Sequence, residues 1–527
     1  MARKLLFVTV DQLHGDALSV LDHPCARTPV LDRLAADGVL FRRHYAQASP
    51  CGPSRASLLT GLYQMNHRSV ANGTPLDSRH TNVALEVRRL GVVPTLFGYT
   101  DTSPDPRTLP PGDPALSTYE GVLPGFEVGC RMTEAAWPWR AHLQAKGYDL
   151  PDDPLGVYAP VDGGAGFAGA GTHPPTPRYT AAHSDTAFLT DRVLEWLGPR
   201  RGQDWFVHVS YLRPHPPLIA PEPWNRAIDP ADVPAAARPL SLDQERAAHP
   251  FLRWLHRKHD RPDVYTGHDV ALCDLDEAEL RQVQANYYGL LAEVDHHLGR
   301  IVEHLQATGE YDETLIVVTS DHGELLGDRW LFGKEGFFDR AFHVPMIVRD
   351  PHAAAAPTRG RTVEAFTEAV DVMPTLLDWM GAEPPVECDG RSLLPFLAGR
   401  TPAGWRGQAH FEFDFRDPDG LGAEEFLDLA PDQCTLNVLR GERFKYVHFT
   451  ALPPLLFDLQ SDPDECRNLA DDPGFADVVR DCAQTLLSWR MTHADRRFAN
   501  TLLTERGPVS FSGPRVPIGP GKVPGAG

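Results

Sequence analysis

The hydrophobic pattern of the chain alternates between short apolar runs and amphipathic segments. Residues 4–10 (KLLFVTV) form an apolar run of strand length that ends at the polar Asp11. Thr28 then precedes Pro29, and Gly38 follows nine positions after this proline, as expected for an N-cap, a proline in the first helical turn and a stop. The chain therefore begins with a β-strand followed by an α-helix.

The same alternation recurs further along the chain. Residues 205–211 (WFVHVSY) and 314–324 (TLIVVTSDHGE) are predicted to be buried strands that run into polar loops. Between them, apolar residues recur at helical spacing from Leu280 to Leu305. Strands that alternate with helices indicate an α/β fold, with a large, mostly parallel mixed sheet flanked by helices.

The pattern changes after about residue 400. Three segments alternate like antiparallel strands joined by turns: 407–415, 434–449 and 453–459. A last helix is predicted over 475–490. We assign residues 1–400 to a large α/β domain, 401–505 to a smaller C-terminal α+β domain, and 506–527 to a Gly/Pro-rich tail without regular structure. Residues 150–180 are also rich in Gly and Pro and are predicted to form a long surface loop.

Composition narrows the function classes. The 527 residues can bury a large core, and the formal charge of −21 argues against a nucleic-acid backbone or an anionic membrane as partner. Eight dispersed cysteines indicate neither a disulfide framework nor a zinc site. The apolar run at residues 5–10 is not followed by a signal-peptide cleavage site. The sequence also contains no run of about 18 apolar residues, the length needed to span a bilayer. We therefore expect a cytoplasmic protein.

Acidic residues follow two of the predicted strands. Asp11 ends the first strand, and Asp321 and His322 end the strand that begins near residue 315. Because functional groups gather at the carboxyl edge of a parallel sheet, these side chains could converge. Carboxylate oxygens and one imidazole suit a divalent cation. The alternative is that the two aspartates only cap neighbouring helices or turns.

Cys51 stands between two prolines in the segment SPCGPSRASLLTG. If a helix begins just after Pro53, Cys51 lies beside the N-terminal N–H groups, where an anion is stabilised. Arg55 adds a fork of donors one turn later. This arrangement is typical of a nucleophile that attacks a tetrahedral oxyanion centre. The alternative is a buried structural cysteine near a turn.

The motif CGPSRASLLTG resembles the C-x-P-S-R…L-x-T-G signature of the sulfatase family of the alkaline phosphatase superfamily, in which the cysteine is oxidised to formylglycine. The resemblance extends to TPVLDRLAADGVLF, SDHGELLGD, DVMPTLLDWMG, CDGRSLLPFLAG and LFDLQSDPDECRNLA, and implies an alkaline phosphatase/sulfatase-like fold. Within the family, the chain looks most like phosphonate monoester hydrolases, which cleave phosphonate monoesters, phosphodiesters and, promiscuously, sulfate esters. Asp11-Gln12 replaces the paired aspartates of common arylsulfatases, and no G-K-W-H-x-G segment follows Gly98-Tyr99.

The resemblance also implies roles for individual residues. One divalent metal ion would be held by Asp11, the modified Cys51, Asp321 and His322. Arg55 would stabilise the formylglycine hydrate, while Lys334 and His215 would contact the transferred group or protonate the leaving alcohol. The remaining pocket residues would be Gln12, Asn72 and Tyr99. Asp101 departs from the run of threonines expected after Tyr99, and it either faces the pocket or caps the turn that follows. The imidazole nitrogen moves the expected metal from calcium towards manganese, so we expect Mn²⁺ first and Ca²⁺ second.

The implied chemistry depends on a hydrated aldehyde, which carries two hydroxyls on one carbon. One hydroxyl attacks phosphorus or sulfur and displaces the alcohol, and the second then expels the oxyanion as the carbonyl reforms. The resemblance further implies a small anionic ester substrate, maturation by a formylglycine-generating enzyme, and a homotetramer. Two alternatives are an arylsulfatase with the same nucleophile and a catalytically silent metal-binding scaffold in which Cys51 stays a thiol.

Overall fold

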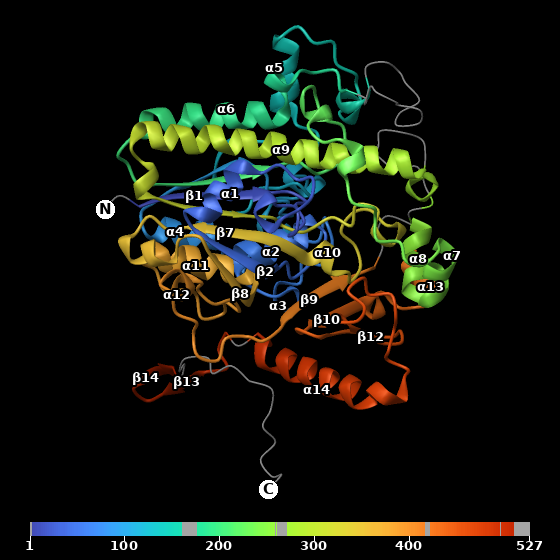
Figure 1. Cartoon of the computed structure of the whole chain (residues 1–527). Helices are drawn as coiled ribbons and strands as arrows, with labels where there is room; N and C mark the ends of the chain where they lie inside the picture. The colour runs from blue at the N-terminus through green and yellow to red at the C-terminus, as the bar shows by residue number, and fades with distance from the viewer. Residues whose placement is uncertain are drawn as a thin grey trace.

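An eight-stranded sheet lies at the centre of the molecule (Figure 1). The computed structural model describes residues 3–160, 176–258, 260, 271–416, 422–495 and 497–510. The strand order is β4-β3-β5-β1-β6-β7-β2-β8. The strands are β1 Lys4–Val10, β2 Val39–Tyr45, β3 Pro94–Gly98, β4 Glu127–Arg131, β5 Trp205–Tyr211, β6 Thr314–Thr319, β7 His343–Arg349 and β8 Arg361–Glu368.

Most neighbouring strands of this sheet run parallel. β1 pairs in parallel with β5 on one side and β6 on the other, and only β7 runs antiparallel to its neighbours β6 and β2. The predicted mostly parallel mixed sheet is therefore confirmed. All seven residues of β1 are buried, as expected for a continuous apolar run in a central parallel strand. Asp11 consequently lies at the carboxyl end of the central strand.

Helices cover both faces of the sheet (Figure 1). Alternate side chains of β1 enter different cores, because successive residues of a strand point to opposite faces. Leu6 and Val8 pack in the core beneath α1 (Pro29–Ala36), α6 (Asp185–Leu197) and α9 (Glu277–Thr308). On the opposite face, Leu5 and Phe7 pack in the core beneath α2 (Cys51–Thr60), α4 (Val83–Arg89) and α11 (Val372–Trp379).

Two helices agree closely with the sequence prediction. α1 has Thr28 as its N-cap and Pro29 as its first residue. α9 starts after a capping box at Asp276 and ends before Gly309, which adopts a left-handed conformation. The remaining α-helices of the described chain are α3 Gln64–His67, α5 Trp137–Ala145, α7 Leu242–Ala248, α8 Pro250–Lys258, α10 Asp339–Phe342, α12 Leu394–Leu397, α13 Ala423–Leu427 and α14 Ala476–His493.

A second, antiparallel sheet with the order β12-β11-β10-β9 lies beside the first, and α14 packs against it (Figure 1). Its strands are β9 Ala409–Asp414, β10 Thr435–Arg440, β11 Phe444–Phe449 and β12 Leu455–Asp458. The predicted smaller C-terminal α+β unit is thus confirmed. A cluster of buried apolar side chains, including Phe342 and Phe411, joins the two sheets.

Two predictions for Gly/Pro-rich segments need correction. The start of the predicted tail is not irregular, because Gly507–Ser510 forms β14, which pairs with β13 (Thr501–Thr504). The predicted surface loop at 150–180 is partly buried, since Tyr158 and Tyr179 pack around Trp139. The segment is partly buried because it contains aromatic residues, which pack into the core, among its glycines and prolines. Residues 161–175 and 511–527 of these two segments lie outside the described residues.

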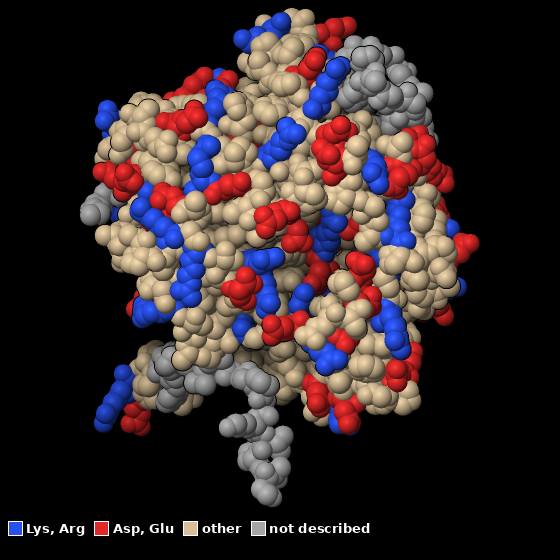
Figure 2. Space-filling view, viewed as in Figure 1, with Lys and Arg blue, Asp and Glu red and all other residues tan. Residues whose placement is uncertain are grey.

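The surface carries both signs of charge. Figure 2 shows acidic and basic side chains intermixed over the viewed face, so the net charge of −21 is not gathered there into one acidic field. No helix in the described part of the chain has the length and apolar character needed to cross a bilayer.

Candidate active site

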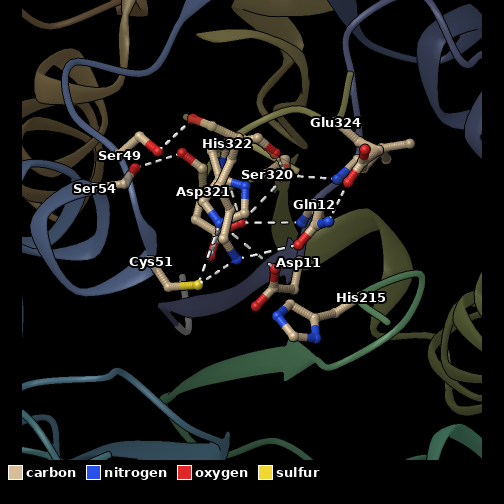
Figure 3. A network of polar contacts seen from close by, with 12 residues as sticks. Asp11, Gln12, Ser49, Cys51, Ser54, His215, Ser320, Asp321, His322 and Glu324 are labelled. Carbon is tan, nitrogen blue, oxygen red and sulfur yellow. Dashed lines mark hydrogen bonds and ion pairs between the residues drawn. The ribbon is translucent and has the colours of Figure 1, made fainter. Parts of the chain in front are cut away.

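Four buried side chains meet at the carboxyl ends of β1 and β6 (Figure 3). Asp11 follows β1, Asp321 and His322 follow β6, and Cys51 is the first residue of α2. One potential ligand atom from each residue lies within 4.8 Å of the others. The structure therefore brings together the four residues that the sequence analysis assigned to a metal ion.

The start of α2 differs from the prediction of a helix that begins after Pro53. The helix includes Cys51, and Pro50 is its N-cap with an extended backbone. Pro53 fits within the first turn because the N–H groups there have no partner inside the helix, so a missing N–H costs no hydrogen bond. Cys51 is thus part of the helix N-terminus rather than a neighbour of it.

The donor set fits a divalent cation. His322 Nδ1 donates to the carbonyl of Gly323 (3.1 Å), so the neutral ring presents the lone pair of Nε2 to the cluster. Nε2 lies 3.7 Å from Asp11 Oδ1 and 3.6 Å from Asp321 Oδ2. Burial lowers the pKa of His322 to about 4, which keeps this ring neutral. Asp11 Oδ1 is buried without a hydrogen-bond partner, a costly state that a bound cation would relieve.

Arg55 binds the two carboxylates of this group. Its Nε donates to Asp321 Oδ2 (2.9 Å) and its Nη2 to Asp11 Oδ2 (3.2 Å). Its Nη1 donates to the carbonyl of Tyr99 (3.0 Å) and to Ser210 Oγ (2.7 Å), and the guanidinium carbon lies 4.1 Å from the centre of the Tyr99 ring. Arg55 therefore fixes the positions of both carboxylates. Ser210 was missed in the sequence because nothing in its strand distinguishes it.

Lys334 reaches the same point from the loop after β6. Its Nζ donates to Cys51 Sγ (2.9 Å) and to Gln12 Oε1 (3.1 Å). Burial would lower the pKa of Lys334, but the nearby carboxylates of Asp11 and Asp321 raise it above its ordinary value, so the group is a cation. The Gln12 side chain in turn donates to Glu324, which also accepts from the Gly333 N–H (2.6 Å). This chain of contacts holds the Lys334 loop against the site.

Glu324 was not singled out by the sequence analysis, although it stands in the quoted segment SDHGELLGD. Its carboxylate is fully buried and links Gln12 to the loop that carries Lys334. The signal that could have identified Glu324 is a carboxylate two residues after the predicted ligand His322, in a segment that follows a strand.

The thiol of Cys51 is enclosed, with 3% of the residue exposed. Burial raises the pKa of this thiol well above its ordinary value. The positive charge of Lys334 lowers this pKa, and the negative charges of Asp11 and Asp321 raise it. An unmodified Cys51 is therefore protonated near neutral pH, and a protonated thiol is a poor nucleophile.

The remaining pocket residues surround the start of α2. Asn72 Oδ1 accepts from the Gly52 N–H (2.9 Å), and a Cβ at Gly52 would lie only 3.0 Å from that oxygen, so glycine permits the close approach. The Tyr99 hydroxyl donates to Asp11 Oδ2. Asp101 Oδ2 lies 4.0 Å from Arg55 Nε, and burial raises the pKa of this carboxyl well above its ordinary value.

His215 enters the site from the loop after β5 (Figure 3). Its Nδ1 contacts the carbonyl of Pro216 (2.9 Å). Because a carbonyl only accepts, Nδ1 carries the hydrogen, and Nε2 of the neutral ring presents a lone pair. Burial and the charge of Lys334 lower the pKa of His215 to about 3, so the ring is neutral near pH 7.

A mostly parallel α/β sheet with a buried metal-binding group and a cysteine at a helix N-terminus defines a hydrolase of the alkaline phosphatase-like fold. The profile of the sulfatase family matches residues 3–382, and that of the N-sulphoglucosamine sulphohydrolase C-terminal region matches residues 327–492. The chain belongs to the sulfatase family. Membership implies a formylglycine at Cys51 and a bound metal ion.

Similar proteins narrow the class further. The chain is 44% identical over 505 residues to the multifunctional alkaline phosphatase superfamily protein PehA of Trinickia caryophylli, covering 94% of this chain and 97% of that protein. The phosphonate monoester hydrolase of Agrobacterium radiobacter is 46% identical with a TM-score of 0.92, covering 97% and 100% of the two chains. The phosphonate monoester hydrolase SpPMH from Silicibacter pomeroyi is 43% identical with a TM-score of 0.89, covering 96% and 99%. Within its family, this protein is a hydrolase of the phosphonate monoester hydrolase type.

Proposed function

We propose that this protein is a metal- and formylglycine-dependent hydrolase of phosphonate monoesters and phosphodiesters, with promiscuous activity on sulfate esters. The observation that carries the proposal is the position of Cys51, whose sulfur lies beside the metal-binding atoms and 2.9 Å from Lys334 Nζ. The names of the two phosphonate monoester hydrolases support the phosphonate monoester part of this proposal, and the name of PehA supports more than one activity.

The proposed cofactor is one divalent cation held by Asp11, residue 51, Asp321 and His322. When bound, such a cation supplies positive charge that lowers the pKa of a neighbouring hydroxyl and stabilises developing negative charge. We favour Mn²⁺ over Ca²⁺ because the neutral His322 ring offers a nitrogen lone pair to the site.

Individual residues of the protein would then have separate roles in the reaction. One hydroxyl of the formylglycine hydrate would give up its proton and form a bond to phosphorus, while the bond from phosphorus to the alcohol oxygen breaks and the departing oxygen takes up a proton. The cationic Lys334 would donate to an oxygen of the reacting group, because its ammonium already reaches the Cys51 sulfur. In the release step the second hydroxyl would lose its proton and the carbonyl would reform, while the bond from the same carbon to the bridging oxygen breaks and the phosphorus leaves with that oxygen as a phosphonate or phosphate. His215 Nε2, with its lone pair, is the proposed acceptor of that proton.

Maturation and assembly complete the proposal. We propose that a formylglycine-generating enzyme converts Cys51, and that conversion precedes folding because 3% exposure leaves no room for a second active site. We also propose a homotetramer in the cytoplasm. The cytoplasmic assignment is supported by the eight cysteines, which all lie in the described part of the chain and form no disulfide there.

The main alternative is an arylsulfatase, since the chain is also 25% identical over 490 residues to the arylsulfatase of Clostridium perfringens. The test compares kcat/KM for a phosphonate monoester, a phosphodiester and a sulfate monoester that share one leaving group, on one preparation of known formylglycine content. We expect the first two substrates to exceed the third. A sulfate monoester that reacts fastest would favour the arylsulfatase, and inactivity of fully converted, metal-loaded protein on all three would favour the silent scaffold.

A further inference from the structure

Arg213 lies two residues before His215 and has no contact with the metal-binding group. Its side chain is fully buried, and its Nη1 donates to two backbone carbonyls of the His215 loop, those of His215 (2.6 Å) and Pro217 (3.2 Å). One guanidinium nitrogen therefore holds the backbone on both sides of Pro216. The same loop carries the carbonyl that accepts from His215 Nδ1.

The guanidinium group of Arg213 is itself held from two further directions. Its Nε donates to Asp185 Oδ2 (2.9 Å) at the start of α6, and the Tyr158 hydroxyl donates to the same oxygen (3.1 Å). The guanidinium carbon lies 4.3 Å from the centre of the Tyr158 ring. The His215 loop is thereby attached to α6 and to the segment at 155–158, neither of which reaches the metal-binding group.

These contacts fix both the backbone and the ring of His215. Arg213 holds the His215 carbonyl, and the Pro216 carbonyl holds Nδ1, so Nε2 is the ring atom left to act on a substrate. A planar guanidinium can bind a carboxylate and two carbonyls at once, whereas an ammonium is a point charge on a flexible chain.

We propose that Arg213 is a positioning residue, which sets the place of the His215 imidazole through the backbone of its loop. The proposal rests on the proposed role of His215. A misplacement of about 1 Å at a reacting group can reduce the rate by roughly 100-fold. Loss of the guanidinium fork should therefore affect turnover through His215 and through no other group.

The test is a double-mutant cycle of Arg213→Lys and His215→Ala, with all proteins matched for formylglycine and metal content. Arg213→Lys keeps the positive charge beside Asp185 but loses the fork. We expect kcat to fall by about 10- to 100-fold with little change in KM. The loss of kcat in Arg213→Lys should depend on the leaving group of the substrate in the same way as the loss of kcat in His215→Ala. In a protein that already carries His215→Ala, Arg213→Lys should cause no further loss of kcat.

Arg349→Lys is the matched control. Arg349 is also buried, donates to the carbonyls of Tyr311 (2.6 Å) and Thr314 (3.4 Å), and stacks on the Tyr311 ring, but it lies at the other end of the sheet. This variant should lose thermal stability and keep kcat. Asp185→Asn, which preserves the size of the carboxylate, replaces Arg213→Lys in the cycle if the lysine variant does not fold.

The outcomes separate the two ideas. If Arg213→Lys costs the same factor with and without His215, or if it leaves kcat unchanged in folded protein, the positioning role is overturned while the proposed function stands. If His215→Ala alone retains full activity, the proposed role of His215 is wrong, and the inference about Arg213 falls with it.

Discussion

The ammonium nitrogen of Lys334 lies 2.9 Å from the sulfur of Cys51, although the two residues are 283 positions apart in the chain. The sulfur is bonded to Cβ, the carbon that would carry the two hydroxyls of a formylglycine hydrate, so it lies near the place that one of those oxygens would take. Lys334 is thus held beside residue 51 by Gln12 and by the loop contacts of Glu324, as its proposed role as a hydrogen-bond donor to the reacting group requires.

Lys334→Ala should lower kcat/KM by about 100- to 1,000-fold, the usual cost of removing one donor to a developing charge. Steady-state kinetics on a phosphodiester would measure the loss, and Lys146→Ala, an exposed lysine after α5, is the control. Retention of more than a tenth of the wild-type activity would contradict the role of Lys334.

Cys51 should be a formylglycine in the active protein. Tryptic cleavage releases residues 44–55, and mass spectrometry should find this peptide in the aldehyde form, lighter than the thiol form. Cys51→Ala should fold and lose several orders of magnitude in turnover, because the nearby Ser49 and Ser54 hydroxyls donate to backbone carbonyls and offer no substitute nucleophile. A fully active preparation with only thiol at position 51 would overturn the mechanism.

Removal of the metal ion should abolish activity and lower the melting temperature. The carboxylates of Asp11 and Asp321 would lose the cation between them, and only Arg55 and Lys334 would remain to compensate their repulsion. We expect Mn²⁺ to restore activity more fully than Mg²⁺. Differential scanning calorimetry and kinetics on chelated protein would measure both effects, and full activity in metal-free protein would refute the shared site.

Asp101 should discriminate between substrates by charge, and increasingly so as pH rises. Burial raises the pKa of Asp101, so the carboxyl is neutral at low pH and gains its charge only above that raised pKa. A charged Asp101 would disfavour a second negative charge at contact distance by about 1–4 kcal/mol. The ratio of kcat/KM for a phosphodiester over a dianionic phosphate monoester should therefore increase with pH.

Asp101→Asn and Asp101→Thr should remove the part of this pH dependence that the carboxyl causes, raising the monoester activity more than the diester activity. Identical effects of the substitutions on the two substrates at every pH would show that Asp101 does not select by charge.

The fold should lose stability as pH falls from about 6.5 towards 3, partly because of His67. Ser69 N–H donates to His67 Nδ1 (3.1 Å), so Nε2 carries the hydrogen towards Ser57 Oγ (2.9 Å) and the buried ring is neutral. Burial lowers the pKa of His67 to about 3. Between that value and the unfolded pKa of about 6.5, the unfolded state binds one more proton, so the free energy of unfolding rises with pH.

His67→Gln should reduce the slope of the unfolding free energy against pH by about 1.36 kcal/mol per pH unit in this window, although the variant is less stable at pH 7. Urea unfolding between pH 4 and 7 would measure the two slopes. Equal slopes for the variant and the wild type would contradict a neutral His67.

The sequence alone was sufficient to predict the helices and strands in which buried residues form a continuous run or recur at a regular spacing. β1 is a continuous apolar run, and α1 and α9 carry their caps in the sequence. The position of Asp11 and of Asp321 at strand ends also follows from sequence, because the carboxyl edge of a parallel sheet is a fixed place.

Other features depend on contacts between distant parts of the chain, which no local period records. Arg55 binds Asp321 across 266 residues, and Ser210 joins the same guanidinium from β5. Likewise, the attachment of Arg213 to Asp185 appears only once α6 lies beside β5. The hairpin of β13 and β14 was not predicted because β14 begins with glycine and proline, which are uncommon in strands.

The close approach of His322 Nε2 to Cys51 Sγ, at 3.2 Å, joins positions 271 residues apart. A ribosome that adds about 5–20 residues per second needs on the order of 10–50 s to make that stretch. Until His322 and Lys334 have been synthesised, Cys51 cannot be enclosed by its final neighbours. The time needed to synthesise this stretch is therefore a minimum for the period in which Cys51 is open to the proposed modification. Slower synthesis between these positions should yield a larger active fraction from the same messenger.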